Sequence, residues 1–252
     1  METAASRRGR FGRRIESLKQ GVLATLAAIV PERCVCCEGA IERPVDRPLG
    51  EPVVWCGACA SSAVPLGGPV CLDCQGGESR RQCGRRAHRR VLAAVQFGRE
   101  TGALVRATKY EAYPERMSAW RDAWVERIGK ASDVDLLVPV PAHPVRVRER
   151  GYDVTDVWAR HLAALEGVPV ARALARVRQT PPQAGADRAQ RLANVRGAFA
   201  AGPEAASVAG RRVALVDDVV TTGSTVRTAA QVLDELGAAE IEIWALAFDP
   251  LD

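Results

Sequence analysis

The sequence predicts an α/β domain with a parallel sheet, preceded by a small cysteine-rich domain. Apolar, strand-like runs alternate with Ala- and Arg-rich helical segments from residue 91 to 252, which is the pattern of a parallel sheet flanked by helices. All eight cysteines fall between Cys34 and Cys83, in a stretch rich in Gly, Pro and Arg. We therefore divide the chain into a basic leader with a helix (1–30), a cysteine-rich domain (31–90) and an α/β domain (91–252).

The composition is that of a folded protein with a mild basic excess. Hydrophobic residues make up 47% of the 252 positions and the net charge is +5, so the chain is globular and long enough for more than one domain. Arginines gather at residues 7–14 and 80–90. Such clusters fit either contact with nucleic acid or an ordinary solvated surface, and the sequence leaves both open.

The first 30 residues predict an amphipathic helix packed on the body. The apolar positions at helical spacing are Ile15, Leu18, Val22, Leu26 and Ile29. No convincing signal-peptide cleavage site follows the short apolar run. No stretch reaches the roughly 18 apolar residues that a membrane span needs. We expect a soluble, cytoplasmic protein.

Two CxxC pairs predict a structural zinc site. They are Cys34 with Cys37 and Cys56 with Cys59. Each turn brings two thiolates to one metal, and two turns complete the tetrahedral set that zinc accepts. Four thiolates leave no open position for water, so a catalytic zinc is not expected. A disulfide cluster is the alternative, and the absence of a signal peptide disfavours it.

A second set of cysteines is incomplete. It consists of Cys71, Cys74 and Cys83. A further CxxC would need cysteine at position 86, where the chain has Arg86. His88 could complete a Cys3His site, and Cys36 is the alternative fourth ligand or a spare thiol. The sequence does not decide between them.

The α/β region divides into alternating elements. The expected strands are Leu92–Phe97, Leu136–Pro139, Val213–Asp217 and Ile241–Ala247. The expected helices are Thr101–Lys109, Glu115–Lys130, Val154–Leu165 and Ser224–Leu236. Gly237 is expected to end the last of these helices. Asp187 followed by Gln190 predicts the start of another short helix.

The segment 213–226 predicts a site for a sugar phosphate. A buried strand leads into Asp217 and Asp218, and a turn of small residues precedes the next helix. The turn residues are Thr221, Thr222, Gly223, Ser224 and Thr225. Backbone N–H groups at a helix N-terminus bind phosphate, and glycine lets the backbone approach it closely. The two carboxylates can accept hydrogen bonds from ribose hydroxyls, directly or through magnesium, and can stabilise positive charge that develops on the sugar.

This segment resembles the loop of type I phosphoribosyltransferases that binds phosphoribosyl pyrophosphate (PRPP). The stretches VPVPAHPVRVRERGYD (138–153) and RVRQTPPQAGADRAQRLANVRGAF (176–199), together with the CxxC pairs, resemble the ComF family of GntX-like competence proteins. The resemblance spans roughly residues 31–248, with the motifs in the same order. It implies a zinc-ribbon domain followed by a type I phosphoribosyltransferase fold that binds PRPP with Mg²⁺. It also implies a role in natural transformation, handling single-stranded DNA with a helicase and a DNA-protection protein.

The resemblance extends to further residues. It implies that Lys109, in the run Thr108-Lys109-Tyr110, meets the pyrophosphate. It makes a second group candidates for acceptor or pyrophosphate contacts, namely Arg148, Arg150, Gly151 and Tyr152. Asp153 and Val154 then stand where the family usually has Asn and Gln. Four residues match the next family stretch, namely Thr180, Gln183, Arg191 and Asn194.

Two classes of function follow from these features. One is an enzyme, a phosphoribosyltransferase (a glycosyltransferase of the pentosyl type) with an unknown acceptor. Its oxocarbenium-like transition state needs positioning and charge more than a nucleophile, so the lack of a triad is no objection. The other is a non-catalytic module that binds PRPP or docks DNA or protein. His143 is expected to be a plain loop residue. The five tryptophans are scattered along the chain and predict no platform for stacking bases.

Overall fold

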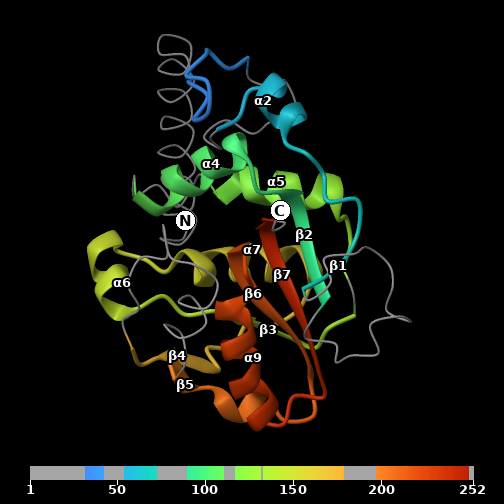
Figure 1. Cartoon of the computed structure of the whole chain (residues 1–252), viewed down its shortest axis with the longest axis vertical. Coiled ribbons are helices and arrows are strands. Elements are labelled where there is room, and N and C mark those ends of the chain that lie inside the picture. The colour runs from blue at the N-terminus through green and yellow to red at the C-terminus, as the bar shows by residue number, and fades with distance from the viewer. Residues whose placement is uncertain are drawn as a thin grey trace, which may run out of the picture.

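The computed structural model describes residues 32–42, 54–72, 90–110, 117–131, 133–178 and 197–249. Within these ranges five strands form one sheet in the order β1-β2-β7-β6-β3. Their bounds are Val70–Cys71 (β1), Arg90–Gln96 (β2), Leu136–Pro139 (β3), Arg212–Val220 (β6) and Glu240–Phe248 (β7). Strands β2, β7, β6 and β3 are parallel, and β1 pairs antiparallel with β2 at the edge. Figure 1 shows β6 and β7 at the centre of the molecule.

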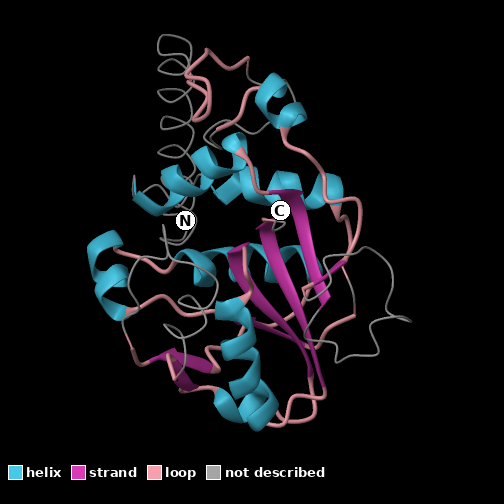
Figure 2. Ribbon diagram, in the orientation of Figure 1, coloured by secondary structure: helices cyan, strands magenta, loops and turns pink. Residues whose placement is uncertain are grey.

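Helices cover both faces of this sheet. One face packs against α4 (Arg99–Tyr110), α5 (Met117–Arg127) and α7 (Val154–Glu166), and the other packs against α9 (Ser224–Glu235). In Figure 2, α9 crosses in front of the magenta strands. Successive β6 residues alternate between the two cores, since Val213 and Leu215 face α9 while Ala214 and Val216 face the opposite layer. A parallel sheet covered on both sides needs such apolar strands throughout, and this explains the apolar run in the sequence.

Tryptophans fill the core on the face opposite α9. The ring centroids of Trp120 and Trp158 lie 5.7 Å apart, those of Trp124 and Trp158 5.9 Å, and those of Trp124 and Trp244 5.5 Å. All four rings are fully buried. Buried aromatic groups in edge-on contact contribute strongly to core stability. These four tryptophans therefore stabilise the fold and are not available to stack nucleic-acid bases.

The cysteine-rich region contributes to this same core. Cys34, Val54, Trp55 and Cys59 belong to the apolar cluster that also contains Trp120. Its helix α2 (Gly57–Ser62) lies above α4 and α5 in Figure 1. The division at residue 90 stays a prediction, because the two regions share buried contacts.

A second, two-stranded sheet lies beside α9. Strands β4 (Leu174–Arg176) and β5 (Phe199–Ala201) pair antiparallel, and a short 3-10 helix follows at Ala205–Ser207. At Gly202 a Cβ atom would lie 2.4 Å from the Arg172 carbonyl oxygen, so only glycine fits there.

The structure confirms the predicted strands and helices of the α/β region, with small shifts at their ends. β3 has the predicted bounds, and β6 continues past Asp217 because Val219 and Val220 still pair with β7. Gly237 adopts φ 83° one residue beyond Leu236, the C-cap of α9, as its role at the helix end requires. Helix α6 (Pro144–Arg150) and the β4–β5 pair were not predicted from the sequence. The predicted helices at 1–30 and near Asp187 lie outside the described residues.

No helix in the described ranges is long and apolar enough to cross a membrane.

Candidate functional site

Four cysteines come together as the sequence predicts. The Sγ atoms of Cys34, Cys37, Cys56 and Cys59 all lie within 4.8 Å of one another, and none of the four forms a disulfide. The Cys37 and Cys56 sulfurs are 3.7 Å apart. Zn–S bonds of about 2.3 Å in a tetrahedron separate two sulfurs by roughly 3.8 Å. The four thiols could therefore hold a zinc ion.

Each CxxC pair folds into a tight turn. The amide of Glu38 donates to the Cys34 carbonyl oxygen at 2.9 Å, and the amide of Cys34 donates to the Gly39 carbonyl oxygen at 2.9 Å. Glu38 has φ 60°, in the left-handed region that favours glycine. In the other pair, Cys56 caps α2 and its Sγ accepts from the Cys59 amide at 3.5 Å. These local bonds shape both turns, and the amide of Val35 donates to the Val54 carbonyl oxygen at 3.0 Å and so joins the two segments.

The thiols differ in acidity. Burial raises the pKa of Cys34, but hydrogen bonds with the backbone at Cys56, Cys37 and Cys36 outweigh this and bring it down to about 6. Burial, together with the neighbouring thiols of Cys56 and Cys37, raises the pKa of Cys59. A bound cation would favour the thiolate form of every member, since metal binding to thiols releases protons.

The second predicted metal set cannot be assembled from the described residues. Cys71 lies in β1 and is partly buried, whereas Cys74, Cys83 and His88 lie outside the described ranges. Cys36 packs against the core next to the first cluster. Neither of the predicted alternatives for a fourth ligand is tested.

Two adjacent carboxylates lie near the carboxyl end of β6. Asp217 and Asp218 are each 9% exposed. One oxygen of Asp217 accepts from the Asp218 amide at 2.9 Å, and one of Asp218 accepts from the Val219 amide at 2.7 Å. Lys109, from the last turn of α4, forms an ion pair with Asp218. Three residues that the sequence analysis singled out for one site are thus neighbours, although Lys109 is far from the acids in sequence.

Burial sets the electrostatics of this group. Burial and the nearby charge of Asp218 raise the pKa of Asp217 to about 7. The Asp218 amide and the charges of Lys109 and Arg176 lower this pKa, but their effect is smaller. Burial lowers the pKa of Lys109, but the charge of Asp218 more than reverses this and the net shift is upward. The site therefore favours added positive charge or hydrogen-bond donors next to Asp217.

Arg176 is a neighbour that the sequence analysis did not single out. It is the last residue of β4. Burial lowers its pKa, although the negative charges of Asp217 and Asp153 act in the opposite direction. Its guanidinium carbon lies 5.5 Å from the centre of the Phe199 ring on β5. Only the fold brings it near the acids, because the β4–β5 pairing carries no strong local pattern.

The turn after β6 and the start of α9 form the predicted phosphate loop. Gly223 has φ 72° and directly precedes α9. The hydroxyls of Thr222 and Ser224 bond each other at 2.8 Å and are both buried. Thr221 and Thr225 are partly exposed. The loop thus offers backbone amides at a helix N-terminus and two hydroxyls with access to solvent.

Helix α6 and the turn after it pack against the end of α4. The guanidinium carbon of Arg150 lies 5.3 Å from the centre of the Tyr110 ring, which is 70% exposed. The Tyr152 hydroxyl donates to the Thr108 carbonyl oxygen. Arg148 is exposed on α6, and Gly151 ends that helix with φ 85°. Arg150 and Tyr152 therefore lie beside the helix turn that carries Lys109.

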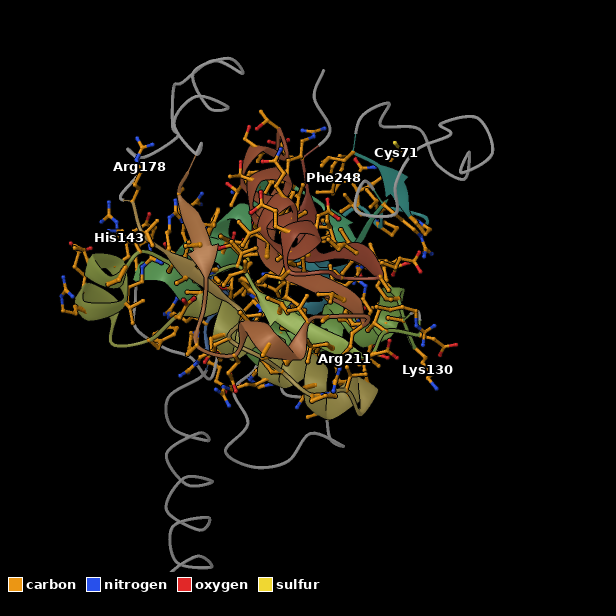
Figure 3. All side chains as sticks on the ribbon, turned by 90° about the horizontal axis from the view of Figure 1, so that it is seen from below. Cys71, Lys130, His143, Arg178, Arg211 and Phe248 are labelled. Atoms are coloured by element: carbon orange, nitrogen blue, oxygen red, sulfur yellow. The ribbon has the colours of Figure 1, made fainter. Side chains whose placement is uncertain are left out.

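Two loop residues close the turns on either side of α6. His143 caps the helix, with Nδ1 accepting from the Val145 amide at 3.3 Å. One oxygen of Asp153 accepts from the Thr155 amide at 3.1 Å and the other from the Ala142 amide at 2.9 Å. Asp153, which replaces an amide residue of the family pattern, thus ties the turn before α7 to the loop between β3 and α6. Figure 3 shows His143 on the side of the molecule opposite Cys71.

The four residues matched to the next family stretch lie outside the described residues. They are Thr180, Gln183, Arg191 and Asn194.

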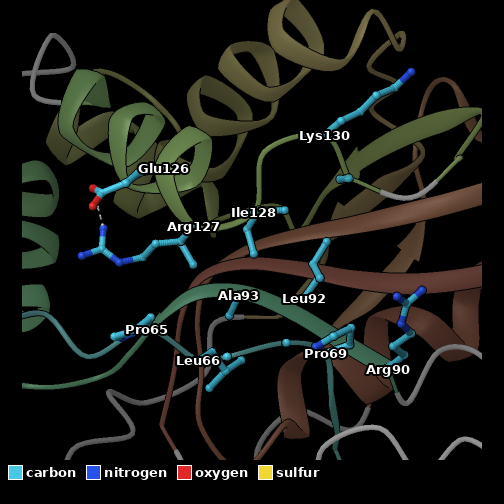
Figure 4. A pocket seen from close by; sticks show the side chains of 14 residues that line it. Pro65, Leu66, Pro69, Arg90, Leu92, Ala93, Glu126, Arg127, Ile128 and Lys130 are labelled. Carbon is cyan, nitrogen blue, oxygen red and sulfur yellow. Dashed lines mark hydrogen bonds and ion pairs between the residues drawn. The ribbon is translucent and has the colours of Figure 1, made fainter.

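A cavity of about 430 Å³ lies elsewhere, between the loop at residues 65–69, β2 and α5 (Figure 4). None of the residues lining it belongs to the predicted phosphate or carboxylate groups. Arg127, on its wall, donates to the carbonyl oxygens of Ala60 and Ala63 and so joins α5 to the end of α2. This cavity is part of the junction with the cysteine-rich region.

Comparison with protein families identifies the class of the α/β domain. The profile of the phosphoribosyl transferase domain matches residues 149–251. This range contains both carboxylates and the whole loop, so the chain is a phosphoribosyltransferase-domain protein.

Two known relatives are similar to this chain over different lengths. Competence protein F of Haemophilus influenzae is 36% identical over 114 residues, covering 45% of this chain and 50% of the relative. DNA utilization protein YhgH of Salmonella typhi is 29% identical over 226 residues, covering 84% of this chain and 88% of the relative. The first match thus spans about half of the relative's length, while the second spans most of both chains. Together with the domain match, these two relatives support a ComF-like family for this chain.

Among solved structures, adenine phosphoribosyltransferase of Leishmania tarentolae is similar over 56% of this chain and 74% of its own. The identity is 17% and the TM-score 0.32.

Proposed function

We propose that this chain binds PRPP together with Mg²⁺ at the carboxyl end of β6. The observation that carries the proposal is the buried pair Asp217 and Asp218, which lies two residues before the loop that opens α9. Ribose hydroxyls donating to these carboxylates would satisfy oxygens that burial has removed from water. The phosphate would accept from amides at the N-terminus of α9.

The cationic side chains near the two acids would attract the negatively charged pyrophosphate group of PRPP. Lys109 stands beside Asp218, and the charge of Arg150 is close enough to oppose that of Lys109. Carboxylate oxygens are suitable ligands for Mg²⁺, so the donor set of Asp217 and Asp218 fits this ion. When bound, Mg²⁺ would neutralise charge on the pyrophosphate. In the ligand-free chain Lys109 pairs with Asp218. Once ribose hydroxyls engage Asp218, Lys109 would donate to a pyrophosphate oxygen.

The reaction that this arrangement suits is phosphoribosyl transfer. The bond between ribose C1 and a pyrophosphate oxygen breaks, a nitrogen of the acceptor forms the new bond to C1, and pyrophosphate leaves. Asp217 and Asp218 would stabilise the positive charge that develops on the sugar. Arg148, Arg150, Gly151 and Tyr152 are the candidates for contacts on the acceptor side.

A second candidate is a PRPP-binding module without turnover. The relatives' names, competence protein F and DNA utilization protein, support a role in competence and in the use of DNA. The family resemblance in the sequence makes this a role in handling single-stranded DNA during natural transformation. Such a role would involve a helicase and a DNA-protection protein as partners. Arginines at residues 80–90 would then contribute a salt-dependent attraction to DNA.

We also propose that the cysteine cluster holds a structural zinc. Four thiolates in tight turns leave no position for a reacting water, so the ion would act on folding.

The acid pair gives the direct test of the binding site. The variant Asp217→Asn with Asp218→Asn keeps the shape and hydrogen-bonding oxygens but removes both charges, so we expect it to lose measurable PRPP binding in calorimetry. Asp133→Asn, an exposed acid before β3, is the matched control and should bind normally. Unchanged affinity in the double variant would place the site elsewhere.

A test for turnover distinguishes a phosphoribosyltransferase from a PRPP-binding module without activity. A transferase releases pyrophosphate from PRPP only when the right acceptor is present. Nucleobases and single-stranded DNA are the acceptors to screen, with a coupled pyrophosphate assay. Binding of PRPP without release under any acceptor favours the binding module.

A further inference from the structure

The cysteine-rich region reaches the phosphate loop through one side chain. Leu72, which directly follows β1, is 3% exposed. A Cβ atom built on Gly223 would lie 2.5, 2.6 and 2.8 Å from the Cδ1, Cδ2 and Cγ atoms of Leu72. Real Cβ atoms do not approach so closely, so the leucine occupies space that only glycine leaves open. Gly223 is thus required both for its positive φ and for its contact with Leu72.

Arg227 provides a second link between the same two segments. One nitrogen of its guanidinium donates to the Thr222 carbonyl oxygen at 2.7 Å, and the other donates to the Leu72 carbonyl oxygen at 3.2 Å. Its own amide bonds the Gly223 carbonyl oxygen at 2.9 Å, which places it in the first turn of α9. A planar guanidinium can fix two acceptors in one geometry because its donors form a rigid fork.

The segment that carries Leu72 is itself held in place. We refer to residues 70–72 as the strap. Val70 pairs with Val91 in β2, and Cys71 pairs with Arg90. Val70 and Leu72 belong to the same apolar core as Val220 and Val226, which flank the loop. The strap is thus fixed by strand pairing and core packing, and it supports the loop from a defined position.

We propose that Leu72 and Arg227 are positioning residues for the phosphate loop, so that the cysteine-rich region forms part of the framework of the binding site. The strap holds the loop in the conformation that presents its amides. A loop already ordered loses less entropy when a ligand binds. The consequence for PRPP affinity rests on the proposed function, whereas the effect on loop order rests on the contacts alone.

Two variants remove the two links separately. Leu72→Ala takes away the packing on Gly223, and Arg227→Met takes away the bridge while keeping much of the side-chain bulk. Matched controls are Leu66→Ala, which packs against the same core, and Gln231→Met, exposed on the same helix. Hydrogen–deuterium exchange of amides 221–225 in the ligand-free protein is the first readout. We expect exchange about tenfold faster in both test variants, since opening of the loop controls it, with β6 and β7 unchanged.

A double substitution tests the direct contact. Gly223→Ala should speed loop exchange in the wild-type background, because its Cβ collides with Leu72. In the Leu72→Ala background the three colliding atoms are gone, so the added effect of Gly223→Ala should be clearly smaller. Additive effects on loop exchange would show that the two residues act independently, and this would contradict the proposal.

Calorimetry with PRPP is the last readout. We expect affinity about tenfold weaker in Leu72→Ala and Arg227→Met, and Arg227→Lys should restore little because lysine lacks the fork. If the wild-type chain does not bind PRPP, the proposed function fails. Hydrogen–deuterium exchange of the loop then still tests whether the strap keeps the loop ordered. Loop exchange at wild-type rates in both test variants would overturn the role of Leu72 and Arg227.

Discussion

At the scale of single residues, Asp217 shows how a binding group opposes stability. Its pKa in the folded chain is about 7, above its ordinary value of 3.8. The folded state therefore binds more protons than the unfolded state between about pH 4 and 7. The stability that this carboxyl contributes is fully present below pH 4 and is lost as the pH rises through 7.

Replacing this acid should separate stability from binding. We expect Asp217→Asn to raise the melting temperature at pH 8 and to reduce the fall in stability between pH 4 and 7, because the amide carries no charge and still accepts from the Asp218 amide. Thermal unfolding followed at pH 5 and pH 8 measures both effects. An Asn variant that is less stable than the wild type at pH 8 would show that the carboxylate is favourable in the unliganded fold.

Glu38 is a second residue with a local requirement. It stands at φ 60° between the first CxxC pair and Gly39. Side chains branched at Cβ are disfavoured there by about 1–2 kcal/mol, whereas glycine is not. We expect Glu38→Val to lower the midpoint of zinc release in a chelator titration and Glu38→Gly to leave it near wild type. Equal behaviour of the two variants would mean that the turn is not set by this backbone angle.

At the scale of elements, Arg127 joins α5 to the cysteine-rich region. Its side chain is 11% exposed and donates to two carbonyl oxygens at the end of α2. Hydrogen bonds from charged groups contribute about 1.5–3 kcal/mol each at most, so Arg127→Met should destabilise the protein by about 1–3 kcal/mol in urea unfolding. Arg121→Met, on the same helix, is the control, since Arg121 pairs with its sequence neighbour Asp122. Equal losses in both variants would argue against a specific junction.

Elements with strong local patterns could be predicted from the sequence, and others could not. The β3, β6 and β7 strands are apolar runs, and α7 and α9 have clear apolar spacing. Helix α6 has seven residues and no buried side chain, so it lacked an apolar pattern. Its signals were Pro144 in the first turn and Gly151 at the end, and both could have been used. The β4–β5 pair has three residues per strand and depends on tertiary contacts.

The same distinction holds for the site. Asp217, Asp218 and the loop are contiguous, so one motif indicates them all. Lys109 was found only through family resemblance, because nothing in its own segment points to an acid on another strand. Arg176, Leu72 and Arg227 reach the site through the pairing and packing of distant segments. Their positions follow from the fold, and no sequence pattern of their own indicates them.

At the scale of the whole molecule, the cysteine cluster and the main core are continuous. Cys34 and Cys59 pack in the cluster that contains Trp120 and Trp124. We expect Cys34→Ser with Cys37→Ser to lower bound zinc by one ion per chain and to reduce the melting temperature of the whole protein. Elemental analysis and calorimetry measure these two quantities, with Ser61→Ala, an exposed position on α2, as the control. Unchanged zinc content in the double variant would refute the metal site.

We propose that PRPP binds at the carboxyl end of β6 together with Mg²⁺. The most direct measurement is calorimetric titration of the zinc-replete chain with PRPP, in the presence and absence of Mg²⁺. We expect one site per chain with binding that depends on Mg²⁺. Absence of PRPP binding under both conditions would contradict the account, and would leave the loop and its two carboxylates as a framework without this ligand.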